Sequence, residues 1–230
     1  MRSRLKALFG RLIRLSPRAH RAVRRVVHRW PFARAVLRQF GLGTPPFRPR
    51  ASLLKQLPPL SVGAEIGVHL GDFSAEILRI VTPTRLHLID PWKYESGPEY
   101  RAMLYGGQLQ FGQAEMDDRY AEVMWRFRKE RDQGQVSVHR GASSIVSQEF
   151  PDGYFDWVYI DGNHLYEFVK QDLECFLPKV KVGGYLTGDD YVEGRREVAA
   201  VRRAVTEFLH TQSVHLVAIE EDQFILKRTA

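Results

Sequence analysis

Short apolar runs alternate with longer helical stretches from residue 60 to the end of the chain, and this alternation constrains the fold more than any other feature. A strand followed by a helix is the repeating unit of a parallel α/β sheet. We expect strands at residues 60–66, 84–89, 135–139, 155–160, 184–187, 214–219 and 223–227, and helices at 72–81, 116–131, 166–177 and 195–210. The sequence therefore predicts an α/β fold.

The last two apolar runs are separated only by the acidic turn Glu220-Glu221-Asp222. Two strands joined by so short a turn form an antiparallel hairpin, here added to an otherwise parallel sheet. Ligands of open α/β sheets bind beyond the carboxyl ends of the strands. The functional residues are therefore expected at those ends.

Charge divides the chain into two unlike parts. Residues 1–50 hold 14 Arg and Lys and no acid, whereas the rest of the chain holds 20 basic and 27 acidic residues. Apolar residues from Leu5 to Leu15 recur at spacings of three and four between arginines, which predicts a basic amphipathic helix. Three prolines within residues 45–49 predict a linker. We expect a basic helical extension over 1–50 and one domain over 51–230.

Three interpretations of residues 1–40 stay open. A basic helix with Leu and Phe on one face suits an anionic membrane surface. The apolar stripe could instead pack on the main domain or on a second subunit. Packing on a second subunit would make the protein a homo-oligomer. Nucleic acid would attract the same charge, but it is not an expected partner because no base-reading motif accompanies the arginines.

Cysteine content and hydropathy narrow the compartment. A single cysteine, Cys175, excludes an internal disulfide framework and a cysteine-rich zinc cluster. Arg11 and Arg14 interrupt the apolar stretch that a signal peptide would need, and no apolar run approaches the ~18 residues that cross a bilayer. We expect a cytoplasmic protein, peripheral to the inner face of the membrane if the extension binds there.

Glycines and carboxylates stand at the first two strand ends. Gly67 and Gly71 follow the first strand, where they let the backbone turn tightly toward a ligand, with a helix N-terminus just beyond. Their spacing is not the Gly-x-Gly-x-x-Gly of dinucleotide enzymes. Glu65 precedes this turn and suits a cationic ligand group. Asp90 ends the second strand, where a carboxylate can accept hydrogen bonds from both hydroxyls of a ribose.

Over residues 60–228 the chain resembles the class I S-adenosylmethionine-dependent methyltransferases. Residues 65–71 look like their first motif, and Asp90 matches their ribose-binding acid. The resemblance implies a Rossmann-like, seven-stranded, mostly parallel sheet with helices on both faces and an antiparallel terminal strand. It also places Ala142 and Ser143, after the third strand, near the adenine of the donor.

The likeness extends to a small bacterial branch similar to macrocin O-methyltransferase. Two motifs carry it, Ile-Asp-Pro-Trp at 89–92 and Tyr-Ile-Asp-Gly-Asn-His at 159–164. This branch includes enzymes that methylate sugar hydroxyls, so the resemblance implies a sugar, a glycan or a glycosylated metabolite as acceptor. Asn163 departs from the usual Asp-Gly-Asp-His, which puts a charged role at that position in doubt.

Carboxylates also end the fourth and fifth strands, as Asp161 and as the pair Asp189-Asp190. Three carboxylates with no obvious basic partner repel one another unless a cation or proton compensates, and oxygen-rich sites suit Mg²⁺. The pattern resembles metal-dependent catechol and caffeoyl-coenzyme A methyltransferases, which implies Asp161 and Asp189 as metal ligands, with Asp190 in the place of a family Asn. The alternative is structural, because Asp-Gly and Gly-Asp-Asp also make turns and helix caps.

His164 lies three residues after Asp161, on the loop that enters the next helix. Methyl transfer to a hydroxyl needs its proton removed, and imidazole has a suitable pKa for that step. We therefore predict His164 and Asp161 as catalytic residues, with Asp161 also contacting the donor. A helix-capping role for His164 is the alternative, and a packing role is expected for His69.

Residues 91–134 are too long for an ordinary connection between strands. Such an insertion can close over the donor and shape the acceptor site. Its aromatic residues are natural surfaces for a sugar ring: Trp92, Tyr94, Tyr100, Tyr105 and Phe111. A packed subdomain or a dimer contact is the alternative.

These features together favour an S-adenosylmethionine-dependent methyltransferase that acts on a hydroxyl oxygen, with divalent metal assistance. Two alternatives share the sheet, namely a non-catalytic nucleotide- or S-adenosylmethionine-binding module and an NAD-dependent oxidoreductase. The oxidoreductase would require the other glycine spacing and would leave the aspartates unexplained.

Overall fold

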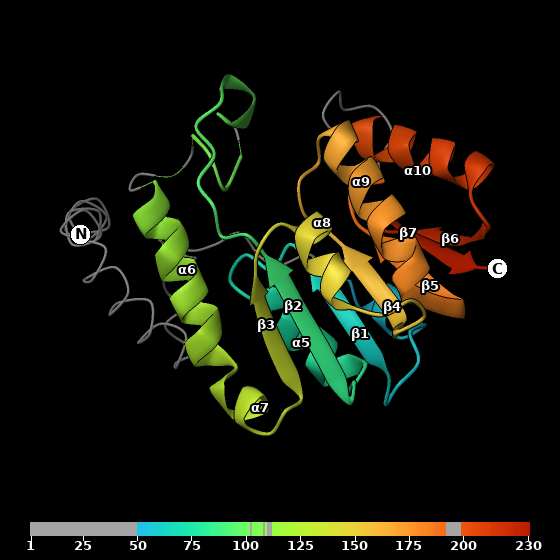
Figure 1. Ribbon diagram of the computed structural model, residues 1–230, viewed down its shortest axis with the longest axis horizontal. Coiled ribbons are helices and arrows are strands. Elements are labelled where there is room, and N and C mark those ends of the chain that lie inside the picture. Colours follow the sequence, from blue (N-terminus) through green and yellow to red (C-terminus); the bar gives the residue numbers. More distant parts are fainter. Residues whose placement is uncertain (1–49, 102, 108, 110–111, 192–198) are drawn as a thin grey trace, which may run out of the picture. The chain divides into compact units, whose positions relative to one another are not determined.

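The predicted strands assemble into one seven-stranded sheet in the computed structural model, in the order β3-β2-β1-β4-β5-β7-β6 (Figure 1). The structure describes residues 50–101, 103–107, 109, 112–191 and 199–230. The predictions for the extension over residues 1–49 and for Phe111 lie outside these residues. The strands are β1 (Val62–Ile66), β2 (Arg85–Asp90), β3 (Val136–Arg140), β4 (Phe155–Ile160), β5 (Val180–Gly188), β6 (Val214–Glu220) and β7 (Gln223–Arg228).

The first five strands run parallel, and β7 is antiparallel to both of its neighbours. This arrangement confirms the predicted Rossmann-like sheet and its closing hairpin. The register pairs Ile66 with Ile89 and with Ile160, and pairs Ile160 with Gly188. Because these strands end level with one another, the residues that follow them meet at one edge of the sheet.

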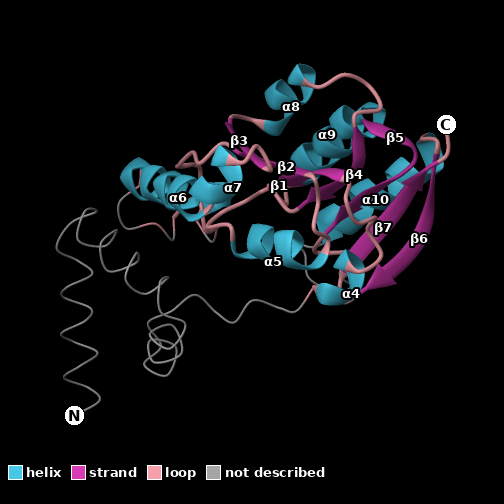
Figure 2. Cartoon of the chain, turned by 90° about the horizontal axis from the view of Figure 1, so that it is seen from below, coloured by secondary structure: helices cyan, strands magenta, loops and turns pink. Residues whose placement is uncertain are grey.

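Helices cover both faces of the sheet, as predicted. Figure 2 shows α5 (Asp72–Ile80) on one side and α8 (Ser143–Val146) and α9 (Tyr166–Phe176) on the other. On the side of α9, α10 (Ala199–Thr211) joins the same hydrophobic core. The remaining helices are α4 (Ala51–Leu54), α6 (Gln113–Arg126), α7 (Arg128–Asp132) and three short 3-10 turns at Pro98–Tyr100, Ser147–Glu149 and Leu177–Lys179.

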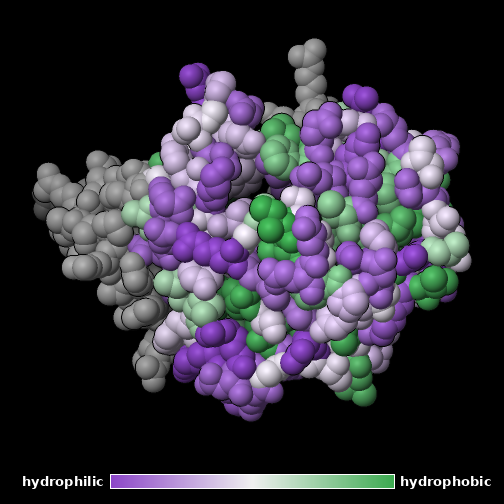
Figure 3. All heavy atoms as spheres, in the orientation of Figure 1, coloured by the Kyte–Doolittle hydropathy of each residue, from purple (hydrophilic) through white to green (hydrophobic). Residues whose placement is uncertain are grey.

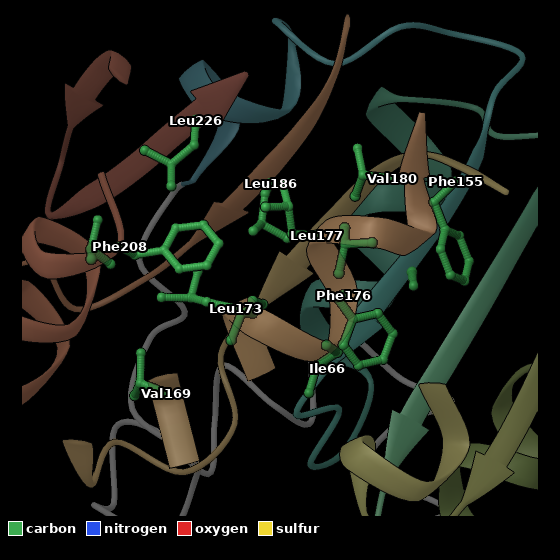
Figure 4. Packing of buried hydrophobic residues seen from close by; sticks show 14 of the residues in the cluster. Ile66, Phe155, Val169, Leu173, Phe176, Leu177, Val180, Leu186, Phe208 and Leu226 are labelled. Atoms are coloured by element: carbon green, nitrogen blue, oxygen red, sulfur yellow. The ribbon is translucent and has the colours of Figure 1, made fainter. Parts of the chain in front are cut away.

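The core lies between the sheet and its helices because each helix has one apolar face. Figure 4 shows side chains of α9 and α10 gathered over the strands, among them Leu173, Phe176 and Phe208. Leu173 and Phe176 are fully buried, as is Leu186 of β5. Burying a side chain of this size contributes about 1.5–3 kcal/mol. This packing gives the carboxyl ends of the central strands a firm support.

The boundaries differ from the predicted ones where the backbone takes special conformations. The first strand starts at Val62 because Leu60 is exposed and has a left-handed φ of 54°. The single helix predicted over 116–131 is two helices, since Phe127 departs from helical geometry between them. The fifth strand is longer than its apolar run and begins at Val180.

The chain divides into two compact units, one containing residues 92–125 and the other residues 49–91 and 126–230. Within the first unit, Trp92 and Tyr100 are buried, and the ring of Trp92 lies 5.1 Å from that of Tyr120. Trp92 and Tyr100 are therefore packed inside the protein, in agreement with the alternative of a packed subdomain. Closure of residues 91–134 over an acceptor stays a prediction.

No helix in the described part of the chain is both long and apolar enough to cross a membrane. On the face in Figure 3, the described residues are mostly hydrophilic, and their hydrophobic side chains form small separate groups. The amphipathic helix predicted from Leu5 to Leu15 lies outside the described residues, so membrane contact through it stays a prediction.

Candidate active site

The turn after β1 has the geometry that its glycines were predicted to allow. Gly67 has a φ of 88°, and a Cβ there would lie 2.0 Å from the carbonyl oxygen of Asp161. Gly71 has a φ of 73° at the start of α5, and its Cβ would lie 2.5 Å from Cε2 of Phe127. Only glycine combines a left-handed backbone with so close an approach. The turn therefore lies directly against the end of β4.

Asp90 fixes this turn from the neighbouring strand. Its Oδ2 accepts hydrogen bonds from the backbone amides of Val68, at 2.9 Å, and His69, at 3.0 Å. The side chain is buried, so these two bonds stabilise the turn in a region with little water. His69 takes a left-handed φ of 54° there, and the packing role expected for its side chain stays a prediction. Binding of a donor ribose by Asp90 remains a prediction, and holding the turn is an additional role that the sequence did not indicate.

Glu65 lies on β1 below the turn and is almost fully buried. Burial raises the pKa of its carboxyl to about 8, although a 2.5 Å hydrogen bond from Ser74 Oγ acts in the opposite direction. Glu65 is therefore largely protonated at neutral pH, whereas the sequence suggested a carboxylate facing a cationic group. A cation that approached Glu65 would lower this pKa and release the proton.

Ser143 and Ala142 begin α8, after β3, where the resemblance places the adenine. Ala142 is exposed, while the hydroxyl of Ser143 donates a hydrogen bond to Asp172 of α9. Burial raises the pKa of Asp172 to about 6, against the effect of that bond. Asp172 could not be recognised from the sequence, because it lies inside a helix, 29 residues after Ser143.

The carboxyl ends of β4 and β5 bring Asp161, Asp189, Asp190 and His164 together, as predicted. The backbone amides of Asp161 and Asp189 donate to the last residues of the neighbouring strands, Ile66 and Ile160. His164 lies between two of the carboxylates, with Nε2 3.3 Å from Asp161 Oδ1 and Nδ1 3.1 Å from Asp190 Oδ2. Its side chain is about one-third exposed, so solvent reaches the imidazole.

Arg50 is a cation in this cluster that the sequence analysis missed. Its Nη1 lies 2.6 Å from Asp161 Oδ2, and its Nη2 pairs with Asp189 Oδ2. The expectation that these carboxylates have no basic partner is therefore wrong. Arg50 lies 111 residues before Asp161 at the end of the proline-containing linker. No local motif connects Arg50 with the aspartates. The one sequence signal is its position as the last basic residue before α4.

The charges of this cluster shift the pKa values of its members. Burial acts to lower the pKa of His164, but the hydrogen bond to Asp161 and the three nearby carboxylates outweigh it and raise this pKa. Burial acts to raise the pKa of Asp161, yet His164 and Arg50 bring it below its usual value. Burial and the charge of Asp161 together raise the pKa of Asp189 to about 7.

The predicted magnesium ligands do not form one oxygen site. Asp161 and Asp190 group with the imidazole of His164, whose ligand atoms lie within 4.8 Å of theirs, while Asp189 is not in that group. Asp161 has one oxygen on Arg50 and the other facing His164. Mg²⁺ prefers oxygen ligands, and a guanidinium keeps its positive charge at every accessible pH. With Arg50 in place, the cluster does not fit the predicted Mg²⁺ site.

Two further residues next to the aspartates have structural roles. Asn163 Oδ1 accepts a hydrogen bond from the amide of Leu165, at 3.0 Å, just before α9 begins. A neutral amide makes this turn as well as a carboxylate would, which explains how the chain tolerates the departure from Asp. Tyr191 is partly buried and packs against the core, with its ring 6.3 Å from that of Phe224.

The sheet order, the glycine turn and the acid that ends β2 define a Rossmann-like methyltransferase fold. Residues 64–191 match the family model described as a methyltransferase domain, and this match spans more than half of the chain. The chain belongs to this family of S-adenosylmethionine-dependent methyltransferases. The family assignment decides against the oxidoreductase alternative. No curated protein gave a significant match.

Solved structures share the fold at low sequence identity. A protein from Corynebacterium glutamicum is 16% identical, with a TM-score of 0.59 over 92% of this chain and 98% of that one. The O-methyltransferase NovP is 23% identical, with a TM-score of 0.55 over 79% and 80% of the two chains. A Staphylococcus aureus protein named as a caffeoyl-CoA O-methyltransferase is 16% identical, with a TM-score of 0.55 over 84% and 91%. These similarities show the fold alone.

Proposed function

We propose that this methyltransferase transfers the methyl group of S-adenosylmethionine to a hydroxyl oxygen of a sugar, a glycan or a glycosylated metabolite. The observation that carries the proposal is the position of His164, a half-buried imidazole held between Asp161 and Asp190 at the edge of the sheet. NovP and the S. aureus protein, which share this fold, are both named as O-methyltransferases. The sugar acceptor is supported only by the sequence motifs at 89–92 and 159–164.

Transfer to oxygen requires one bond to form and one proton to leave. The hydroxyl oxygen attacks the methyl carbon, the carbon–sulfur bond of the donor breaks, and S-adenosylhomocysteine leaves. The unprotonated imidazole of His164 takes the proton of the hydroxyl. Asp190 faces Nδ1 and orients the ring, whereas Nε2 exchanges its contact with Asp161 for the hydroxyl in order to receive the proton. Both carboxylates then stabilise the imidazolium that results.

Divalent metal assistance, predicted from the aspartates, is not part of this proposal. Arg50 already supplies a positive charge to Asp161 and Asp189. Asp161 and Asp190 group with His164, and an imidazole that served as a metal ligand could not accept the proton.

Three measurements test the proposed function. Calorimetry should show binding of S-adenosylmethionine and no binding of NAD. Incubation of the protein and S-adenosylmethionine with a panel of glycans and glycosylated metabolites should add the mass of one methyl group to the true acceptor. The variant His164→Ala should keep donor affinity and lower kcat by about 10²–10⁴-fold. Methylation of a nitrogen in the labelled product, or full kcat in His164→Ala, would contradict the proposal.

A further inference from the structure

Arg50 is anchored in the cluster on four sides. Its guanidinium pairs with Asp161 and Asp189, and its Cζ lies 5.1 Å from the ring centroid of Phe73 and 5.9 Å from that of Tyr159. The side chain is 16% exposed. A planar guanidinium suits this setting, because it can bond two carboxylates at once while it stacks on aromatic faces.

The rings beneath Arg50 are themselves fixed. Phe73 and Tyr159 are buried with centroids 4.4 Å apart, and the hydroxyl of Tyr159 accepts a 2.6 Å hydrogen bond from Gln223. On the backbone side, Arg50 immediately precedes α4, whose Leu53 and Leu54 are buried. The guanidinium is therefore held from both ends of its side chain.

Among the residues that the structure describes, removal of Arg50 would leave Asp161, Asp189 and Asp190 with His164 as the basic group beside them. Carboxylates this close repel one another and need a compensating cation. Arg50 meets that need with a residue of the chain, and it lies outside residues 64–191 that match the family. A guanidinium and a divalent cation cannot occupy the same oxygens, because both are positive and neither can give up its charge.

We propose that Arg50 is the resident cation of this site: it holds Asp161 and Asp189 where a divalent metal would otherwise bind, and it makes the enzyme independent of such a metal. Arg50 is a positioning residue that acts on His164 through Asp161. This proposal rests on the proposed function only in taking the cluster around His164 as the active site. Metal binding can be measured with no acceptor, so a failure of this proposal is distinguishable from a failure of the proposed function.

The full-length protein is first freed of metals with EDTA and dialysed. It is then titrated with Mn²⁺, and electron paramagnetic resonance measures the free and the bound ion. The wild type should show no specific Mn²⁺ site at the aspartates. Arg50→Ala should gain one, with an affinity at least about 10-fold above the wild type, since a full positive charge has left the carboxylates. Mn²⁺ should also raise the melting temperature of Arg50→Ala and not that of the wild type.

Matched variants separate the site from general charge. Arg79→Ala removes the same charge from an exposed arginine of α5 and should bind Mn²⁺ as the wild type does. Arg50→Lys keeps the charge and should not gain a site. The added variant Asp161→Asn should remove the site from the Arg50→Ala protein.

Two results would overturn the proposal. One is a Mn²⁺ site in the wild type that Asp161→Asn abolishes, which means that metal and Arg50 coexist or exchange. The other is a folded Arg50→Ala protein, judged by circular dichroism, that gains no Mn²⁺ affinity. If Arg50→Ala does not fold, the wild-type titration alone tests the proposal. In that case, a wild type with no Mn²⁺ site that Asp161→Asn abolishes supports it.

Discussion

At the scale of single residues, Asp90 holds the turn after β1 and is also predicted to bind the donor ribose. Its Oδ2 accepts the amides of Val68 and His69 inside the protein. Asp90→Ala would leave both amides without this acceptor, at a cost of about 1–3 kcal/mol in the free energy of unfolding. We expect a lower melting temperature and a donor affinity reduced by about 5- to 150-fold in calorimetry, the range that the same free energy corresponds to. An unchanged donor affinity in a folded variant would contradict the ribose role.

His164 connects the geometry of the site with a pH dependence. Only the unprotonated imidazole can take a proton, and the surrounding carboxylates raise its pKa above the ordinary value of about 6.5. We expect kcat/KM to rise with pH with a midpoint above that value. Asp190→Asn removes one of these charges, so it should lower the pKa and move the rise to lower pH by up to about 1 unit.

Asn suits this test because it tolerates the left-handed φ of 60° found at position 190. His164→Ala should lose the rise altogether. A profile of Asp190→Asn that moves to higher pH would mean that His164 is not the titrating base.

Glu65 predicts a pH dependence of stability. Its folded pKa of about 8 lies above the ordinary value of 4.5, so the folded state holds a proton that the unfolded state has lost. Stability from this group is therefore full below about pH 4.5 and declines as the pH rises to 8. Glu65→Gln has no proton to lose at this position. Between pH 5 and 8 the free energy of unfolding in urea should therefore fall less in Glu65→Gln than in the wild type, and the two falls should differ by more than about 1 kcal/mol. Equal slopes for the two proteins would contradict the shift.

At the scale of elements, the turn after β1 joins two strand ends through close backbone contact. Gly67→Ala would place a Cβ 2.0 Å from the carbonyl oxygen of Asp161 and would force Ala into a left-handed conformation. We expect a loss of more than about 2 kcal/mol in denaturant unfolding, together with weaker donor binding.

Gly134→Ala is the matched control for this substitution. Gly134 has a φ of 76°, yet nothing lies within 4 Å of the Cβ that an alanine would add. Its cost should be limited to backbone strain of about 1 kcal/mol, with no change in donor affinity. Similar losses in the two variants would mean that the contact with Asp161 contributes nothing.

At the scale of the whole molecule, the basic segment 1–40 is expected to bind anionic surfaces. The full-length protein should sediment with anionic vesicles and not with neutral ones, and high salt should weaken this binding. Reversing three charges with Arg4→Glu, Arg11→Glu and Arg14→Glu should abolish sedimentation. Vesicle binding that survives the triple substitution would contradict a surface role, and a changed oligomeric mass in that variant would favour packing on a second subunit.

The sequence by itself determined the sheet, its hairpin and the edge that carries the site. Strand and helix periods are local properties, and the carboxyl ends of parallel strands meet at one edge whatever the loops do. For that reason the sequence alone indicates Gly67, Asp90, Asp161, His164 and Asp189 as residues of this edge. The role of Asp90 in holding the turn could not be recognised in this way, because its bonds to Val68 and His69 depend on the register between β1 and β2.

Only the tertiary structure decided how the charges of the site are balanced. Three aspartates indicated a missing cation, and the sequence suggested a metal ion for that place. Arg50 fills that need from 111 residues away, through a guanidinium on Phe73 and Tyr159. Such a pairing follows from chain folding rather than from spacing. The same reason explains Glu65, whose carboxyl looked anionic in sequence and is protonated near neutral pH because the fold removes it from water.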